Sequence, residues 1–283
     1  MTNILEAIVN INEHRHFEIR SMYSGKNRVN NMGEALESYV KDAFANTFNI
    51  KDENIRDSIL EKEFSWLGNQ NNPPDSMIRC GDALEVKKTE SPNAALALNS
   101  SYPKSTIKKD DPLIAPDFVT CEEWEERDII YCVGHTDTSS IKSLWMVYGS
   151  IYAARHETYK RIKDTISTGV NSIPNVEFAD TTELGGVKRV DPLGITNLRI
   201  RGMWHILNPR KVFDYVHKNE KSNSFELVCI IPLEKYTSFP YESKIKLESI
   251  SNPDFSISDV KVKNPNNPAN RLDCKLIKLL VHE

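Results

Sequence analysis

The sequence predicts an α/β (α+β) protein in which helices flank a mixed sheet and a β-rich elaboration follows toward the C-terminus. Three observations predict this class: helical apolar spacing in the first 50 residues, then four or five apolar runs suited to strands, then short strand-like runs from residue 180 onward. The 283 residues are 39% hydrophobic and 27% charged, which excludes disordered and fibrous chains. We expect a core over residues 1–170 and a β-rich region over residues 171–283 that continues from it.

Two helices are expected near the N-terminus. Residues 4–9 show a first helical spacing, and residues 33–48 carry a better one, because apolar side chains recur there at helical intervals. The stripe consists of Ala35, Leu36, Tyr39, Val40, Ala43 and Phe44. A stripe of this width must face a core, and Glu37 lies at its margin.

Apolar runs and the turn residues between them predict the remaining elements. Strands are predicted over residues 63–67, 76–79, 83–88, 128–134, 144–151 and 255–261, and helices from residue 94 and over residues 152–166. Residues 68–74 (GNQNNPP) and 264–270 (NPNNPAN) have compositions that favour loops. After residue 180, Gly-Gly, Asp-Pro and Asn-Pro pairs predict short strands and large loops.

The N-terminal segment, the cysteine spacing and the net charge exclude several classes of protein. No apolar run approaches 18 residues, and polar residues interrupt the N-terminus where a signal peptide needs an apolar stretch, so we expect a cytoplasmic protein with no membrane segment. The five cysteines have no paired spacing and are expected to be reduced thiols. The net charge of −4 excludes a uniformly positive surface. Residues 185–211 nevertheless hold six basic residues against one acidic residue, which predicts a local basic face.

The most informative stretch spans residues 74–88 and contains a Pro-Asp pair followed by Glu-Val-Lys. Side chains alternate along a strand, so Glu85 and Lys87 point to the same side. If residues 80–82 form a three-residue loop with Gly81 at positive φ, residue 79 pairs with 83, 77 with 85 and 75 with 87, and Asp75 shares that side. A two-residue turn would place Asp75 on the opposite side.

Two carboxylates and an amine on one side of a hairpin can carry out a specific chemistry. Asp75 and Glu85 can hold a hard divalent cation, and the Val86 carbonyl with waters completes an oxygen shell suited to Mg²⁺. Lys87 can position the attacking water or stabilise a pentavalent phosphorus. The pattern predicts a phosphodiester hydrolysis site. The alternative is an exposed hairpin with an ordinary i, i+2 charge pair.

A second formal match to this motif begins at Pro253-Asp254 and ends with Asp259 and Lys261. If residues 255–261 form one continuous strand, Asp254 and Asp259 lie about 16 Å apart at roughly 3.3 Å per residue. One cation cannot bridge that separation. Only the first match contains a turn, so the site is assigned to Asp75, Glu85 and Lys87.

Four segments carry a resemblance to a known family. They read GNQNNPPD at 68–75, GDALEVKK at 81–88, ALALNSSYPK at 95–104 and YCVGHT at 131–136. Together they resemble the NgoPII family of type II restriction endonucleases, members of the PD-(D/E)xK nuclease superfamily. The resemblance implies Mg²⁺-dependent double-strand cleavage of DNA at GGCC by a homodimer, with a cognate methyltransferase that acts on the same site and protects host DNA.

The resemblance also implies roles for particular residues and regions. Asp75 and Glu85 match the metal-binding carboxylates, and Lys87 matches the catalytic lysine. Glu37 sits where superfamily members carry a helix-borne acidic residue that supports the site; the alternative for Glu37 is a solvated carboxylate at a helix edge. Residues 1–170 would then be a PD-(D/E)xK catalytic core, and residues 171–283 would recognise DNA.

Two groups of residues are candidates for DNA contact. Asn99, Ser101, Tyr102 and Lys104 follow the active-site strand closely enough to reach the DNA backbone, although an ordinary capped loop would look the same. Arg199 and Arg201 would share one face of a strand, and arginine reads guanine O6 and N7. Their alternatives are phosphate contacts or pairing with carboxylates. Further candidates of this second kind are Lys188, Arg189 and Asn197.

The sequence as a whole therefore predicts a type II restriction endonuclease in which each protomer of a symmetric dimer cuts one strand and leaves 5′-phosphate ends. One alternative is a nonspecific or structure-specific nuclease of the same superfamily. The other is a noncatalytic DNA-binding module whose carboxylates form a surface ion pair.

Overall fold

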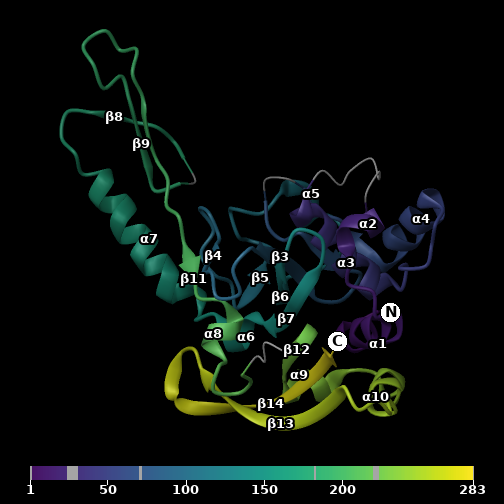
Figure 1. The fold of residues 1–283 in the computed structure, drawn as a ribbon. Helices are drawn as coiled ribbons and strands as arrows, with labels where there is room; N and C mark the ends of the chain where they lie inside the picture. The colour runs from purple at the N-terminus through teal and green to yellow at the C-terminus, as the bar shows by residue number, and fades with distance from the viewer. Residues whose placement is uncertain (1, 24–30, 70–71, 182, 219–222, 283) are drawn as a thin grey trace.

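The computed structural model describes residues 2–23, 31–69, 72–181, 183–218 and 223–282. Its centre is a nine-stranded mixed sheet with helices on its flanks, which confirms the predicted mixed α/β class (Figure 1). The strands follow the order β1 (Phe64–Trp66), β2 (Ser76–Ile78), β3 (Ala83–Thr89), β6 (Glu126–Thr136), β7 (Ile141–Tyr148), β12 (Asn223–Pro232), β14 (Asn267–His282) and β13 (Phe255–Asn264), with β5 (Thr106–Lys108) paired to β6.

The sheet is mixed because two of its pairings are parallel. β3 runs parallel to β6, and β7 runs parallel to β12, whereas the other neighbours are antiparallel. β12, β13 and β14 lie beyond residue 170 in the sequence and complete the sheet that the earlier strands begin. The buried side chains of β6, β7 and β12 form the centre of the hydrophobic core.

Helices from the N-terminal part of the chain cover the sheet beside β3. They are α1 (Ile4–His14), α2 (Ile19–Tyr23), α3 (Met32–Ala45) and α4 (Glu53–Glu63). Asn31 caps α3 by accepting hydrogen bonds from two backbone N–H groups, and the predicted apolar stripe of this helix is buried against β3 and β6. Gly134 of β6 permits the close approach, because a Cβ atom there would lie 2.6 Å from a Leu36 methyl group. This packing brings the polar margin of α3 to the edge of β3.

An arm projects from this core (Figure 1). It consists of α7 (His156–Val170) and a small sheet of β8 (Glu177–Phe178), β9 (Gly185–Lys188) and β10 (Leu198–Ile200). No residue of α7 is buried, so the predicted surface helix is present, but it spans residues 156–170 instead of 152–166. At the base of the arm, β11 (His205–Ile206) pairs with β4 (Leu96–Ala97), so the arm begins beside the segment that follows β3.

Several predicted elements differ from the structure. Residues 96–97 form strand β4 instead of starting a helix, because β11, far later in the chain, supplies their partner. The predicted strand over residues 144–151 ends at Tyr148 and is followed by α6 (Gly149–Tyr152). The remaining short helices are α5 (Pro116–Val119), α8 (Pro209–Val212), α9 (Leu233–Ser238) and α10 (Tyr241–Glu248).

The C-terminal strands are also longer than predicted. β12 and β13 each span 10 residues and β14 spans 16. Residues 264–270 form a tight turn between β13 and β14 and then continue into β14, because pairing with β13 outweighs their loop-favouring composition. No helix among the described residues is long and apolar enough to cross a lipid bilayer.

Candidate active site

The β2–β3 hairpin brings the predicted site residues together, but in a different register. Ser76 pairs with Leu84 and Met77 with Ala83, so the loop consists of residues 79–81 and the predicted pairs are wrong. Cys80, with φ of 54°, takes the left-handed conformation expected of Gly81. Gly81 is instead packed against Ile78, where a Cβ atom would lie 2.9 Å from the Ile78 side chain.

The error of register leaves the predicted face unchanged. In the predicted and in the observed register alike, the numbers of paired residues differ by an even number. Because side chains alternate with a period of two, paired residues therefore keep the same face in both registers. Continuing the observed register places Asp75 level with Glu85 instead of Lys87. Asp75 therefore still lies on the face that Glu85 and Lys87 share.

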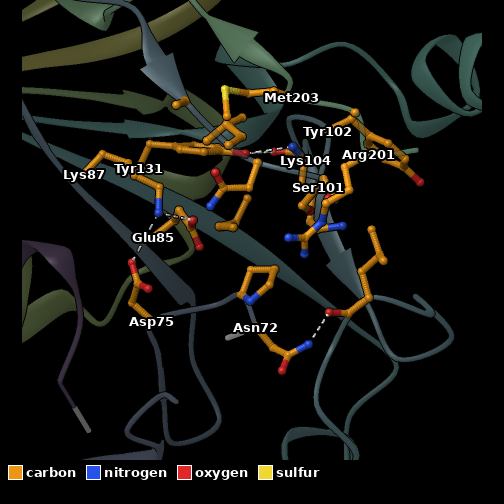
Figure 2. Close-up of a pocket in the computed structure, with 18 of the residues that line it drawn as sticks. Asn72, Asp75, Glu85, Lys87, Ser101, Tyr102, Lys104, Tyr131, Arg201 and Met203 are labelled. Carbon is orange, nitrogen blue, oxygen red and sulfur yellow. Dashed lines mark hydrogen bonds and ion pairs between the residues drawn. The ribbon is translucent and has the colours of Figure 1, made fainter. Parts of the chain in front are cut away.

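Asp75, Glu85 and Lys87 form one compact charged cluster (Figure 2). The Lys87 ammonium lies 2.6 Å from Oε1 of Glu85 and 3.9 Å from Oδ2 of Asp75. The backbone N–H of Val86 donates a 2.6 Å hydrogen bond to the same Asp75 oxygen. Because the N–H and C=O groups of one strand residue point to the same edge, the Val86 carbonyl also faces the Asp75 side.

Burial sets the electrostatics of this cluster. It raises the pKa of Glu85 to about 7, with a further contribution from Asp75, while Lys87 opposes the shift. Burial lowers the pKa of Lys87, but the Glu85 and Asp75 carboxylates outweigh it and hold that pKa above its ordinary value. The Glu85 atom Oε2 is buried and accepts no hydrogen bond from the described residues. The cluster thus keeps a carboxylate oxygen free in a buried position.

Helix α3 adds two further charged groups at the edge of the cluster. Burial raises the pKa of Glu37, and the nearby Asp75 carboxylate raises it further. Lys41 lies one turn later, 4.0 Å from Glu37, and donates a 2.9 Å hydrogen bond to the carbonyl of Leu67. Burial lowers the pKa of Lys41. Lys41 was not among the predicted site residues, although its i, i+4 spacing from Glu37 could have indicated it.

Two hydrogen bonds hold described residues that precede Asp75. The Trp66 indole N–H donates to the carbonyl of Pro74 at 3.1 Å, and the Asn72 amide donates to the carbonyl of Leu113 at 3.0 Å. Gly68 has φ of +89°, and a Cβ atom there would lie 2.3 Å from the Asp75 carbonyl oxygen. These contacts fix the backbone that carries Asp75. Two residues of the GNQNNPPD segment, Gln70 and Asn71, lie outside the described residues.

A cavity of about 610 Å³ opens beside the cluster. The charged cluster lines one side, and residues from the segment after β3 and from the base of the arm line the other (Figure 2). Five of the predicted DNA-contacting residues line it: Asn99, Ser101, Tyr102, Lys104 and Arg201. Its wall also includes residues that sequence analysis did not single out, namely Asn72, Tyr131, Glu183 and Met203.

Lys104 and Tyr102 are held from behind the cavity wall. The Lys104 ammonium is almost fully buried and forms an ion pair with Asp111. The predicted contact between Lys104 and DNA would require this ion pair to open. The Tyr102 ring stacks on Tyr159 of α7, and its hydroxyl hydrogen-bonds the ring of His156 at 2.8 Å. This side of the cavity is therefore built against the arm.

The other four predicted DNA-contacting residues lie on the arm and do not line the cavity. Lys188 and Arg189 form ion pairs with Glu177. Asn197 accepts a hydrogen bond from the Arg189 backbone, which joins the two ends of the arm loop. Arg199 and Arg201 both bind the carboxylate of Glu183, so they share one face as the sequence predicted.

The second formal match to the motif does not form a cluster. Residues 255–261 lie within the continuous strand β13, as expected. Asp254 pairs with Arg15 and Asp259 pairs with Lys275, so each carboxylate has its own partner. The structure brings only the first match together.

Comparisons with known proteins identify the family. A family model described as NgoPII restriction endonuclease matches residues 2–263. The type II restriction enzyme NgoPII of Neisseria gonorrhoeae is 47% identical over 276 residues, which cover 97% of this chain and 98% of that protein. No solved structure matches the chain significantly. The chain belongs to the NgoPII restriction endonuclease family, and these matches confirm both the predicted resemblance and the predicted enzyme class, a type II restriction endonuclease.

Proposed function

We propose that the chain cleaves both strands of DNA at GGCC in a Mg²⁺-dependent reaction that leaves 5′-phosphate ends, with Asp75, Glu85 and Lys87 as its catalytic residues. The observation that carries the proposal is the cluster itself: an ammonium between two carboxylates, at the wall of a cavity that basic and polar residues also line. The β2–β3 hairpin with α3 behind it is the arrangement we assign to a PD-(D/E)xK core within residues 1–170.

The donor atoms at the cluster fit a hard cation. No group of three or more His, Cys, Asp or Glu side chains among the described residues is placed to hold a metal, so the ligands would be two carboxylates, a backbone carbonyl and waters. Asp75, Glu85 and the Val86 carbonyl supply only oxygen, which Mg²⁺ prefers. The buried, unpartnered oxygen of Glu85 supports the assignment, because a buried acceptor without a partner is costly unless a ligand uses it.

Each residue of the cluster has a separate task in hydrolysis. A bound Mg²⁺ supplies Lewis acidity toward a water and a phosphate oxygen. Lys87, whose pKa the Glu85 and Asp75 carboxylates hold above its ordinary value, donates hydrogen bonds to the attacking water or to the phosphate. The Val86 N–H orients Asp75, and Glu37 adds negative charge at the edge of the cluster.

The cavity and the arm supply the contacts to DNA in this proposal. Asn99, Ser101 and Tyr102 offer polar groups to the backbone of the strand that is cut. Lys104, held by Asp111, supports Tyr102 from behind. On the arm, within the proposed recognition region of residues 171–283, the contacting residues are Lys188, Arg189, Asn197, Arg199 and Arg201.

A palindromic target requires two active sites related by a two-fold axis. A symmetric homodimer provides them, and each protomer then cuts one strand. The proposed target, GGCC, rests on the family resemblance, as does a cognate methyltransferase that modifies the same bases without binding the endonuclease.

The proposal is tested by digesting DNA of known sequence in Mg²⁺ and in EDTA, and by mapping the fragment ends. We expect discrete Mg²⁺-dependent fragments that end within GGCC and carry 5′-phosphates. The Asp75→Asn variant should lose cutting by about 1,000-fold or more while it still binds DNA, because it loses a cation ligand. Asp254→Asn, in the second formal motif, is the matched control and should cut normally. A smear, or equal loss in both variants, would contradict the proposal.

A further inference from the structure

One carboxylate holds both arginines at the base of the arm. Glu183 accepts hydrogen bonds from Nε of Arg199 at 2.8 Å, from Nη2 of Arg199 at 2.9 Å and from Nε of Arg201 at 2.7 Å. The Glu183 side chain is only 6% exposed, whereas those of Arg199 and Arg201 are 66% and 63% exposed. The carboxylate is thus covered by the two guanidinium groups that it orients.

Glu183 and one of its two arginines lie at the wall of the active-site cavity. Glu183 and Arg201 line the same cavity as Asp75, Glu85 and Lys87. Figure 2 shows Arg201 across the cavity from that cluster. A carboxylate at the wall of a cavity that receives DNA repels phosphate, so its presence weakens binding to every sequence alike. What the carboxylate can add is discrimination between sequences, because it fixes the direction of the two guanidinium groups that cover it.

The hydrogen bonds to Glu183 use only some of the N–H donors of each arginine, so the others can bind DNA. The carboxylate takes the Nε edge of Arg201 and leaves its two terminal amino groups without a bond to the described residues. An arginine side chain that is already fixed in one orientation loses less rotamer entropy when it binds. Two guanidinium groups on one carboxylate lie side by side, and neighbouring base pairs stack at about 3.4 Å, so the pair can address adjacent positions of a target.

We infer that Glu183 is a specificity-determining positioning residue, which fixes the guanidinium groups of Arg199 and Arg201 in one orientation for contact with the target DNA. This inference rests on the proposed DNA cleavage and adds a role that sequence analysis did not assign. Glu183 itself contacts no reacting atom. It acts through the two arginines, and it affects how strongly the protein prefers its target over other DNA sequences.

The arm contains a matched comparison. Glu177 also holds two cations, Lys188 and Arg189, with the Lys188 ammonium 3.6 Å away. None of these three residues lines the cavity, and the Glu177 side chain is 44% exposed. The removal of either glutamate's charge raises the positive charge of the arm equally, but only Glu183 orients a side chain beside the active site.

The test compares Glu183→Gln with Glu177→Gln. Cleavage rates are measured on the target mapped for the wild-type protein and on duplexes altered at one base pair, and nonspecific binding is measured against salt concentration. Both variants should bind nonspecific DNA more tightly, with a salt slope steeper by about 1. Glu183→Gln should lower the ratio of target to altered-site cleavage tenfold or more, whereas Glu177→Gln should keep it within threefold.

A second variant makes the test independent of folding defects. Arg201→Lys keeps the charge but loses the planar fork, so it should lower the same ratio, and the double variant with Glu183→Gln should lose little more than either single variant. An unchanged ratio in Glu183→Gln, or additive losses in the double variant, would overturn the inference. A wild-type protein that cuts no DNA would instead refute the proposed function.

Discussion

We expect the replacement of Gly68 by Ala, in the segment before Asp75, to lower the rate of DNA cleavage strongly. Gly68 has φ of +89°, and an added Cβ atom would lie 2.3 Å from the Asp75 carbonyl oxygen. An ordinary carbon–oxygen contact is about 3.3 Å, so the two backbone segments must separate by roughly 1 Å. No side-chain rotation can relieve the overlap, because the atoms concerned belong to the backbone.

The expected magnitudes follow from that displacement. A misplacement of about 1 Å in a catalytic constellation can cost about 100-fold in rate, which is roughly 2.7 kcal/mol in the barrier. The positive φ and the overlap together should lower the free energy of unfolding by roughly 2–4 kcal/mol. Asp75 keeps its chemical identity throughout, so the loss of rate reports its position.

The assay is single-turnover cleavage of a labelled duplex that contains the mapped target, with urea unfolding of the same preparations. Gly169→Ala is the matched control, because a Cβ atom at Gly169 in α7 meets nothing within 4 Å. That variant should cut at the wild-type rate and gain roughly 0.5–1 kcal/mol of stability, since alanine favours helix. A Gly68→Ala protein that cuts within threefold of wild type would show that the backbone contact between Gly68 and Asp75 does not control the catalytic geometry.

Two further predictions concern stability. The pKa of Glu85 is raised to about 7 in the folded protein, above its unfolded value near 4.5, so protonated Glu85 favours the folded state and this contribution is lost as the pH rises through 7. In EDTA, the free energy of unfolding of wild type relative to Glu85→Gln should therefore fall by roughly 3 kcal/mol between pH 4.5 and pH 8, as measured by urea unfolding; a flat difference would contradict the assigned cause. Lys104→Met should destabilise the protein by roughly 3–5 kcal/mol, because Asp111 is left buried without its cation. Adding Asp111→Asn should restore most of that stability, and no recovery in the double variant would show that the ion pair is not the cause.

Local periodicity in the sequence was enough to predict much of the catalytic hairpin. The alternation along residues 83–88 placed Glu85 and Lys87 on one face, because the period of two is a property of the extended backbone and needs no partner. The helical spacing of α3 likewise predicted both its buried stripe and the marginal position of Glu37. The four motifs between residues 68 and 136 predicted the family, which the comparisons confirm.

Contacts between distant segments depended on the packing of the whole chain. Strand β4 depended on β11, a strand more than a hundred residues later. The same packing buries the ion pair of Lys104 with Asp111. It also brings Glu183 into contact with Arg199 and Arg201. Backbone geometry repeats locally, so the order of residues was enough to specify which side chains share a strand or helix face. Which faces meet depends on how the whole chain packs. That packing places Glu183 and Arg201, from the projecting arm, at the wall of the cavity beside Asp75.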